Sequence, residues 1–152
     1  MEIIEYKIEH QERFRDLNLQ WISKNFQIEE VDYNVLNNPD QYILKDGGCI
    51  LLVEEKGEII GACALMNEGH GIYELTKMTI DERYRGLKIG FKLGAAILDR
   101  ARSMKAEKVI LYSNTVHNGI AINLYKKLGF IEVPLGQSVW IRADIKMEID
   151  MR

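Results

Sequence analysis

The eleven residues Tyr84–Gly94 read YRGLKIGFKLG, and they decide the fold class of this chain. They combine a glycine-containing turn, two basic side chains and the start of an amphipathic helix. Backbone N–H groups in such a turn and in the first turn of a helix converge on an anion, and Arg85 and Lys88 add positive charge. The spacing matches neither a Walker loop nor GxGxxG. Alone, the segment indicates either a phosphate site or an ordinary helix start.

Basic residues crowd around this segment. Residues 83–105 contain seven lysines and arginines and one acidic residue, Asp99, whereas the whole chain has a net charge of −3. Part of the run is typical of a solvated helix face, but its density at the glycine turn indicates a small polyanion as ligand. The acidic balance of the whole chain argues against a nucleic-acid partner.

Length and composition predict a single domain over residues 1–152. The chain has 152 residues, 47% of them hydrophobic, which suffices for one core. No apolar run reaches the roughly 18 residues of a membrane span and no export signal is evident, so we expect a cytoplasmic protein without a membrane partner. Cys49 and Cys63 lack metal-ligand spacing. We expect buried, reduced thiols and no metal site.

Apolar periodicity predicts an α/β domain with helices around one mixed sheet. Strand patterns cover residues 1–8, 49–54, 58–66, 72–80, 108–112, 130–133 and 143–149. Helical spacing covers residues 10–26, 31–36, 89–103 and 118–128. Glu55-Lys56-Gly57 is a hairpin signal, and residues 67–71 read as a further turn. Asn118 is the expected N-cap of the last helix and Gly129 its end.

The strand 72–80 changes its alternation. Its apolar positions are Tyr73 and Leu75 early but Met78 and Ile80 late, so the side-chain parity switches between them. A β-bulge near Thr76-Lys77 would restore one apolar face. A strand buried on both faces would explain the same pattern.

The element order and two motifs resemble the GNAT superfamily of N-acetyltransferases. The strand 72–80 is followed by YRGLKIG, a long helix, the strand 108–112 and then HNGIAINLYKKLGF, which begins at His117. The match is close over residues 57–133. The resemblance implies a twisted mixed sheet of about six to seven strands flanked by about four helices, with the cofactor acetyl-CoA where two central strands splay apart.

By this resemblance, the pyrophosphate turn of the family falls on Arg85, Gly86, Leu87, Lys88, Ile89 and Gly90. Lys88 stands where the family most often has glycine, so either a glycine-type conformation is not needed here or the lysine adopts it at some strain. Its side chain either adds a charge to the phosphates or faces solvent. Main-chain groups of Met78, Thr79 and Ile80 are expected to bind the pantetheine arm, and one N–H there is expected to stabilise the oxyanion.

The last helix carries the second implied cluster. Asn118, Ala121 and Tyr125 share one helix face, and Ile120, Leu124 and Leu128 form a neighbouring stripe that we expect in the core. The resemblance implies that Asn118 and Ala121 line the pantetheine path and that Tyr125 protonates the departing thiolate. Tyr125 as an aromatic seal between helix and sheet is the alternative.

A general base is needed because an alkyl amine with a pKa of ~10.4 is protonated at neutral pH. The resemblance points to Glu74, acting through a water. A sheet-edge carboxylate paired with Lys77 or Arg83 is the alternative interpretation. His70 and His117 are other candidates that titrate near neutrality.

Two functions follow as hypotheses. The first is an acetyl-CoA-dependent N-acetyltransferase that transfers directly in a ternary complex to a primary amine of a small molecule or peptide. The second is a CoA-binding module without transfer activity, serving as a sensor or assembly partner. Residues 21–33 and 135–140 are expected to wall the acceptor site, where Glu29, Glu30 and Asp32 would attract a cationic amine. Exposed aromatic residues there would equally suit a homodimer surface.

Overall fold

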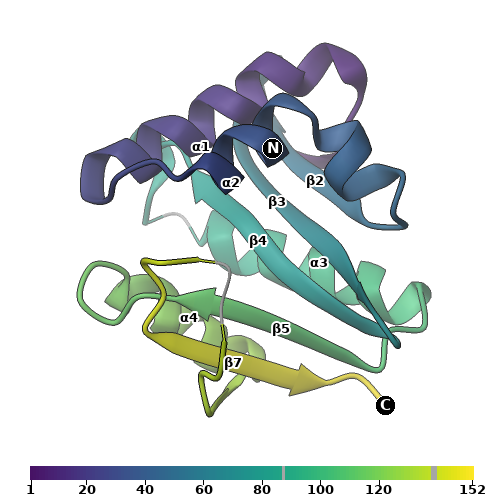
Figure 1. Cartoon of the computed structure of the whole chain (residues 1–152). Coiled ribbons are helices and arrows are strands. Elements are labelled where there is room, and N and C mark those ends of the chain that lie inside the picture. The colour runs from purple at the N-terminus through teal and green to yellow at the C-terminus, as the bar shows by residue number, and fades with distance from the viewer. Residues whose placement is uncertain (87, 138–139) are drawn as a thin grey trace.

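The computed structural model describes residues 1–86, 88–137 and 140–152. Seven strands form one mixed sheet in the order β1-β2-β3-β4-β5-β7-β6, which confirms the predicted α/β class (Figure 1). The strands are β1 (Glu2–Glu5), β2 (Cys49–Glu55), β3 (Glu58–Gly69), β4 (Ile72–Ile80), β5 (Lys108–Ser113), β6 (Ile131–Val133) and β7 (Ile145–Asp150). The α-helices of the described residues are α1 (Gln11–Asn25), α2 (Glu30–Asn37), α3 (Ile89–Ser103) and α4 (Gly119–Leu128). A π-helical turn at Asp40–Leu44 follows Pro39 and was not predicted.

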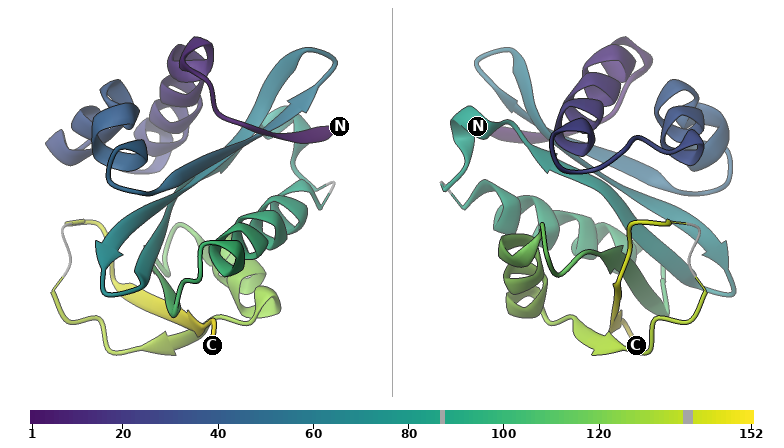
Figure 2. Two further views of the ribbon diagram at one scale, coloured as in Figure 1. Left: turned by 90° about the vertical axis from the view of Figure 1, so that its right-hand side faces the viewer. Right: turned by 60° about the vertical axis from the view of Figure 1, so that its left-hand side comes forward.

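Helices cover both faces of the sheet (Figure 2). On one face, α1, α2 and the π-helical turn pack against a layer that includes Ile50 and Leu52 of β2. On the other face, α3 and α4 pack against Leu51 and Val53 of the same strand. Successive side chains of a strand point to opposite faces, so this strand supplies both cores and reads as a continuous apolar run.

Two tight hairpins connect the central antiparallel strands. Lys56 and Gly57 join β2 to β3 with φ angles of 51° and 81°, and His70 and Gly71 join β3 to β4 with φ angles of 56° and 77°. Positive φ at both central residues is the two-residue hairpin geometry that matches the twist of the strands. The predicted hairpin at 55–57 is confirmed. The second turn is tighter than predicted, because β3 continues to Gly69.

A β-bulge interrupts β4. Ala62 of β3 pairs with Thr79 and Ala64 pairs with Thr76, so two residues of β4 face one residue of β3. The first of these two residues of β4, Lys77, has a φ of 56°. The structure therefore confirms the bulge as the reason for the parity switch, and the left-handed backbone at Lys77 is how the strand accommodates it.

The two helices on the second face approach each other closely. A Cβ added to Gly94 of α3 would lie 2.6 Å from Cδ1 of Leu128 in α4. Ile122 and Tyr125 form the buried side of α4. The prediction that Ile120 belongs to the core is wrong, since its side chain is 91% exposed. Residues two apart in an α-helix differ by about 200°, so a helix that buries Ile122 turns Ile120 outward.

The longest helices of the described residues, α1 and α3, each have fifteen residues. Within that part of the chain, no helix has the length and apolar character needed to cross a bilayer.

Candidate active site

The site forms where β4 and β5 diverge. These parallel strands pair only at their beginnings, with Ile72, Tyr73 and Glu74 opposite Lys108, Val109 and Ile110. Beyond Glu74 the two strands share no register, and the bulge bends β4 further. The second half of β4 thus has main-chain groups on its β5 side with no partner strand in the described sheet. An extended segment of a ligand can form main-chain hydrogen bonds with such an edge.

A cavity of about 90 Å³ occupies this divergence. Its lining includes Met78 from the bulge, Asn118 and Tyr125 around α4, and Trp140 and Arg142 from the segment before β7. Segments far apart in sequence therefore meet here, and three of the residues expected at the site are among them. Thr79 and Ile80 lie instead with Arg85 around a smaller hollow of about 20 Å³.

Two described residues of the glycine turn, Gly86 and Lys88, have positive φ angles. Gly86 has a φ of 82°, and Lys88, the N-cap residue of α3, has φ 60° and ψ 18°. Within the described residues no side chain caps α3 and no acidic residue occupies its first turn, so the N–H groups of that turn are available to an anion. Of the two alternatives for Lys88, the structure shows the one in which lysine adopts the glycine-type conformation. Leu87 lies outside the described residues.

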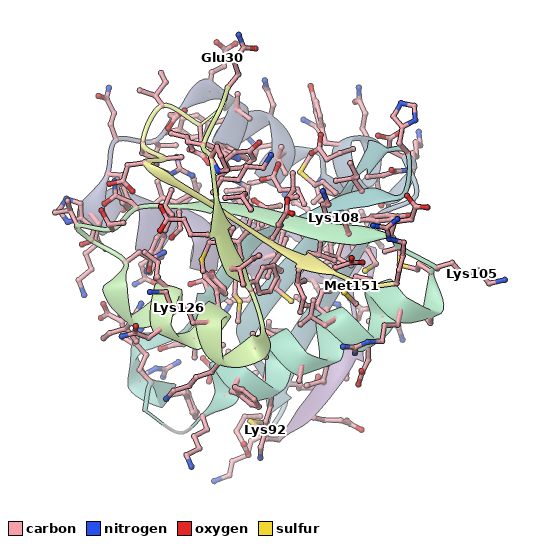
Figure 3. All side chains as sticks on the ribbon, turned by 90° about the horizontal axis from the view of Figure 1, so that it is seen from below. Glu30, Lys92, Lys105, Lys108, Lys126 and Met151 are labelled. Atoms are coloured by element: carbon pink, nitrogen blue, oxygen red, sulfur yellow. The ribbon has the colours of Figure 1, made fainter. Side chains whose placement is uncertain are left out.

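The turn residues differ in exposure. The side chains of Arg85 and Lys88 are exposed, whereas Ile89 is buried in the core beneath α3. A Cβ on Gly90 would lie 3.3 Å from Cδ2 of Leu124, so this glycine permits the close approach of α4. Lys92, one turn further along α3, points away from the molecule (Figure 3).

Asn118 and Tyr125 of the second motif both reach the cavity. Asn118 is the N-cap residue of α4 as predicted, but its Nδ2 donates to the Oγ of Ser113 at 3.0 Å and does not cap the helix. Tyr125 is 8% exposed and packs edge-to-face on Phe130. Burial raises the pKa of Tyr125, so its hydroxyl stays protonated at neutral pH. Ala121 packs against the core instead of lining the cavity.

Glu74 is buried behind the cavity. Its side chain is a hydrogen-bond acceptor for the indole Nε1 of Trp140, at 2.9 Å, and Glu74 does not itself line the cavity. Burial raises the pKa of Glu74 to about 7. The alternative pairing with Lys77 or Arg83 is not observed in the described residues: Lys77 contacts Asp32, and Arg83 contacts Asp81 and Glu58. A carboxyl group that titrates near neutrality fits a proton-transfer role.

A buried ion network forms the wall opposite α4. The ammonium of Lys77 lies 2.8 Å from Oδ1 of Asp32, which is fully buried. The guanidinium of Arg142 donates to both oxygens of Asp32, at 2.8 and 2.9 Å, and to Glu29 at 3.1 Å. Burial alone would raise the pKa of Asp32, but the hydrogen bonds of Arg142 and the charge of Lys77 outweigh it and hold the pKa at about 2. Burial lowers the pKa of Lys77.

This network corrects the expectation for the acidic residues of the N-terminal segment. Asp32 and Glu29 are paired with cations and are not open to a cationic acceptor. Glu30 alone points outward (Figure 3). Sequence reasoning missed Arg142, Ser113 and the role of Lys77. The only available signal was a lysine at an expected bulge, since a charged residue in an apolar strand implies a partner.

The two histidine candidates differ in their distance from the cavity, and neither forms part of its described lining. His70 is in the β3–β4 hairpin, at the opposite end of β4 from the bulge. His117 is exposed and its ring packs edge-to-face on Phe26, with centroids 5.2 Å apart. Neither histidine is among the described residues that line the cavity.

Comparisons with known proteins point to one family. Residues 11–130 match the model of the acetyltransferase (GNAT) family. Mycothiol acetyltransferase of Sanguibacter keddieii is 34% identical over 91 residues, which are 56% of this chain and 29% of that protein. The chain thus spans less than a third of the length of that curated relative.

Two solved structures have the same fold. A GNAT-family acetyltransferase of Staphylococcus aureus superposes with a TM-score of 0.89 at 23% identity, covering 99% of both chains. The PaiA N-acetyltransferase of Thermoplasma acidophilum, solved with coenzyme A, superposes with a TM-score of 0.74 at 18% identity, covering 98% of both chains.

Proposed function

The chain belongs to the acetyltransferase (GNAT) family, and on this basis we propose that it transfers the acetyl group of acetyl-CoA directly to a primary amine of a small molecule or peptide. One observation carries the proposal. The open edge of β4, beside Met78, and the Tyr125 side chain border the same cavity, so an acyl thioester and a proton donor have a common place to meet.

The described residues fit acetyl-CoA as the donor. The turn at Gly86 and Lys88 and the uncapped start of α3 offer N–H groups to the pyrophosphate. Main-chain groups of Met78, Thr79 and Ile80 offer the pantetheine amides a strand-like partner. Asn118 borders the inner end of this path at the cavity. Arg85 is exposed and adds charge beside the turn.

Three groups would then share the chemistry. Removing a proton from an alkyl amine at pH 7 costs about 4–5 kcal/mol, and Glu74 is the proposed base, reaching the amine through a water. An N–H of the bulged strand near Met78 would stabilise the developing oxyanion. The Tyr125 hydroxyl would donate its proton to the departing thiolate, because burial keeps it protonated. No covalent enzyme intermediate is required.

Conservative substitutions test these roles. Glu74→Gln and Tyr125→Phe should each lower the rate of CoA thiol release by about 10²–10⁴-fold, the usual contribution of an acid or base. Calorimetric binding of acetyl-CoA should stay within a few-fold of the wild type. Tyr73→Phe is the matched control, since Tyr73 lies on β4 but does not line the cavity.

The alternative function gives a different result. A CoA-binding module would bind acetyl-CoA tightly and release no thiol with any of a broad panel of amines. Unchanged thiol release in both variants would leave the transfer function standing and remove Glu74 and Tyr125 from the mechanism.

A further inference from the structure

The charged side chains among the described residues that line the cavity are cationic. None of the described residues that line it is acidic, whereas Lys77 and Arg142 both contribute to the lining. The carboxylates that neutralise them, Asp32 and Glu29, are not part of the lining. The ion pairs are therefore oriented, with cations toward the cavity and anions behind them. Such fixed pairs create a positive potential in a confined site even though their net charge is zero.

Arg142 retains hydrogen-bonding capacity in this arrangement. A guanidinium has five N–H donors. Within the described residues Arg142 uses Nη1 toward Glu29 and Asp32, and one N–H of Nη2 toward Asp32. The Nε–H and the second N–H of Nη2 make no hydrogen bond there, and they lie side by side on one edge of the guanidinium. Two parallel donors of this kind match the two oxygens of a carboxylate.

The guanidinium is also accessible and held in place. Its side chain is 19% exposed, compared with 2% for Lys77, so Arg142 is the cation that a ligand can touch. Its central carbon lies 5.1 Å from the ring centroid of Trp140 and 5.8 Å from that of Phe26. These contacts and the bidentate pair with Asp32 fix the guanidinium, so little side-chain entropy remains to be lost when a second anion binds.

We propose that the amine acceptor carries a carboxylate, as an amino acid does, and that Arg142 binds this carboxylate in the cavity. The inference rests on the proposed acetyl transfer and narrows its acceptor. Purely cationic acceptors such as polyamines would bring positive charge toward Lys77 and Arg142 and should bind poorly. The same cations disfavour the protonated form of a bound amine, which helps to supply the nucleophile.

Matched acceptors test the proposal on the unaltered protein. Thiol release is measured with alanine and alaninamide and with β-alanine and β-alaninamide, with spermidine as the polycation. The α- and β-amino acids separate two distances between amine and carboxylate. We expect kcat/KM for at least one acid to exceed that of its amide by about tenfold or more, the effect of a charge-assisted pair of hydrogen bonds. The amine of an amino-acid amide is a weaker base than that of the acid, so more of it is unprotonated at neutral pH. Intrinsic reactivity alone would therefore favour the amide.

Substitutions then assign the contact. Arg142→Gln should lower kcat/KM for the preferred acid by about 10- to 100-fold, mainly through KM, and change kcat/KM for its amide by less than about threefold. Arg142→Lys keeps the positive charge but lacks the two parallel N–H donors. It should therefore lower kcat/KM for the acid by less than Arg142→Gln does. Arg102→Gln, at an exposed arginine on α3, is the control.

Each other outcome overturns the proposal. If amides or spermidine react as well as the acids, the carboxylate contact is wrong while the transfer function stands. Equal losses for acid and amide in Arg142→Gln would mean that Arg142 supports the fold and not the acceptor. If acetyl-CoA binds but no amine of any class releases thiol, the transfer function itself fails, and the acceptor assignment fails with it.

Discussion

The cofactor side and the acceptor side of the cavity are built in different ways. The proposed cofactor side consists of contiguous segments, the end of β4 and the turn into α3, followed by the start of α4, and it offers mostly main-chain groups. The acceptor side is assembled from α1, α2, the bulge and the segment before β7, and it offers side chains held by Asp32. Backbone geometry thus dominates one side, and long-range ion pairing dominates the other.

Because of this difference, substitutions should have different effects on the two sides. A main-chain site tolerates most side-chain changes as long as the backbone keeps its φ and ψ angles. A site made of buried charges does not, because removing one partner leaves the other uncompensated in a medium of low dielectric constant. Three changes probe the contrast, beginning with the largest expected effect.

The largest effect is expected on the acceptor side. Asp32→Asn leaves the buried ammonium of Lys77 without its counter-ion and weakens the pair of hydrogen bonds from Arg142. The free energy of unfolding should fall by about 3–5 kcal/mol, as for other buried pairs from which one partner is removed. Urea denaturation measures it. Glu30→Gln, an exposed acid on the same helix, should change stability by less than about 0.5 kcal/mol. A loss below about 1 kcal/mol for Asp32→Asn would show that Lys77 is uncharged in the folded protein.

The second effect concerns Glu74, which is buried behind the cavity. Its pKa is about 7 in the folded protein against an ordinary value of 4.5. Between these pH values the unfolded chain has lost this proton and the folded chain has kept it, so rising pH lowers stability through the window and has no further effect above it. At about 1.4 kcal/mol per pH unit, the loss is about 3 kcal/mol.

Glu74→Gln removes this penalty because the amide has no proton to lose. It should be more stable than the wild type by about 3 kcal/mol at pH 8 and nearly equal to it at pH 4.5, as measured by urea denaturation across the range. The cost in activity proposed above should accompany this gain. A variant whose stability advantage is the same at both pH values would contradict the raised pKa.

Most of the fold was predictable because its signals are local. The bounds of β4 and the last residue of α3 agree with the pattern, and the parity switch in β4 pointed to the bulge. The errors arose where tertiary packing determines which residues are buried. Ile120 belongs to an apolar stripe by spacing, yet which face of α4 is buried depends on tertiary contacts such as that of Leu128 with Gly94 of α3, which the spacing of α4 does not contain.

The two sides of the cavity differ in the same respect. The turn around Lys88 and the position of Tyr125 belong to short motifs that are contiguous in sequence: Lys88 is the N-cap residue of α3, and Tyr125 lines the cavity. The network around Asp32 joins residues 45 and 110 positions apart in sequence. An acidic residue in a helical segment looks like an ordinary solvated side chain, and only the packed structure reveals that it is buried. Long-range charge pairing is therefore the part of the site that sequence reasoning missed.

The smallest effect is expected on the cofactor side, at Lys88. A lysine with a φ of 60° is in the left-handed region, which costs roughly 1–2 kcal/mol. Glycine has no such strain, but it loses more conformational entropy on folding, so only part of this energy is recovered. Lys88→Gly should therefore be more stable than the wild type by up to about 1 kcal/mol. Lys88→Asn removes the charge but tolerates the same backbone, and calorimetric affinity for acetyl-CoA should stay within about threefold in both variants.

Lys88→Val completes the series, since a β-branched side chain disfavours a positive φ. It should be less stable and bind acetyl-CoA more weakly than the asparagine variant, although both lack the lysine charge. If Lys88→Asn and Lys88→Gly instead lose about tenfold in affinity while keeping their stability, the lysine charge itself contacts the phosphates. The cofactor side would then rely on a side chain as the acceptor side does, because glycine and asparagine keep the backbone conformation and remove the charge.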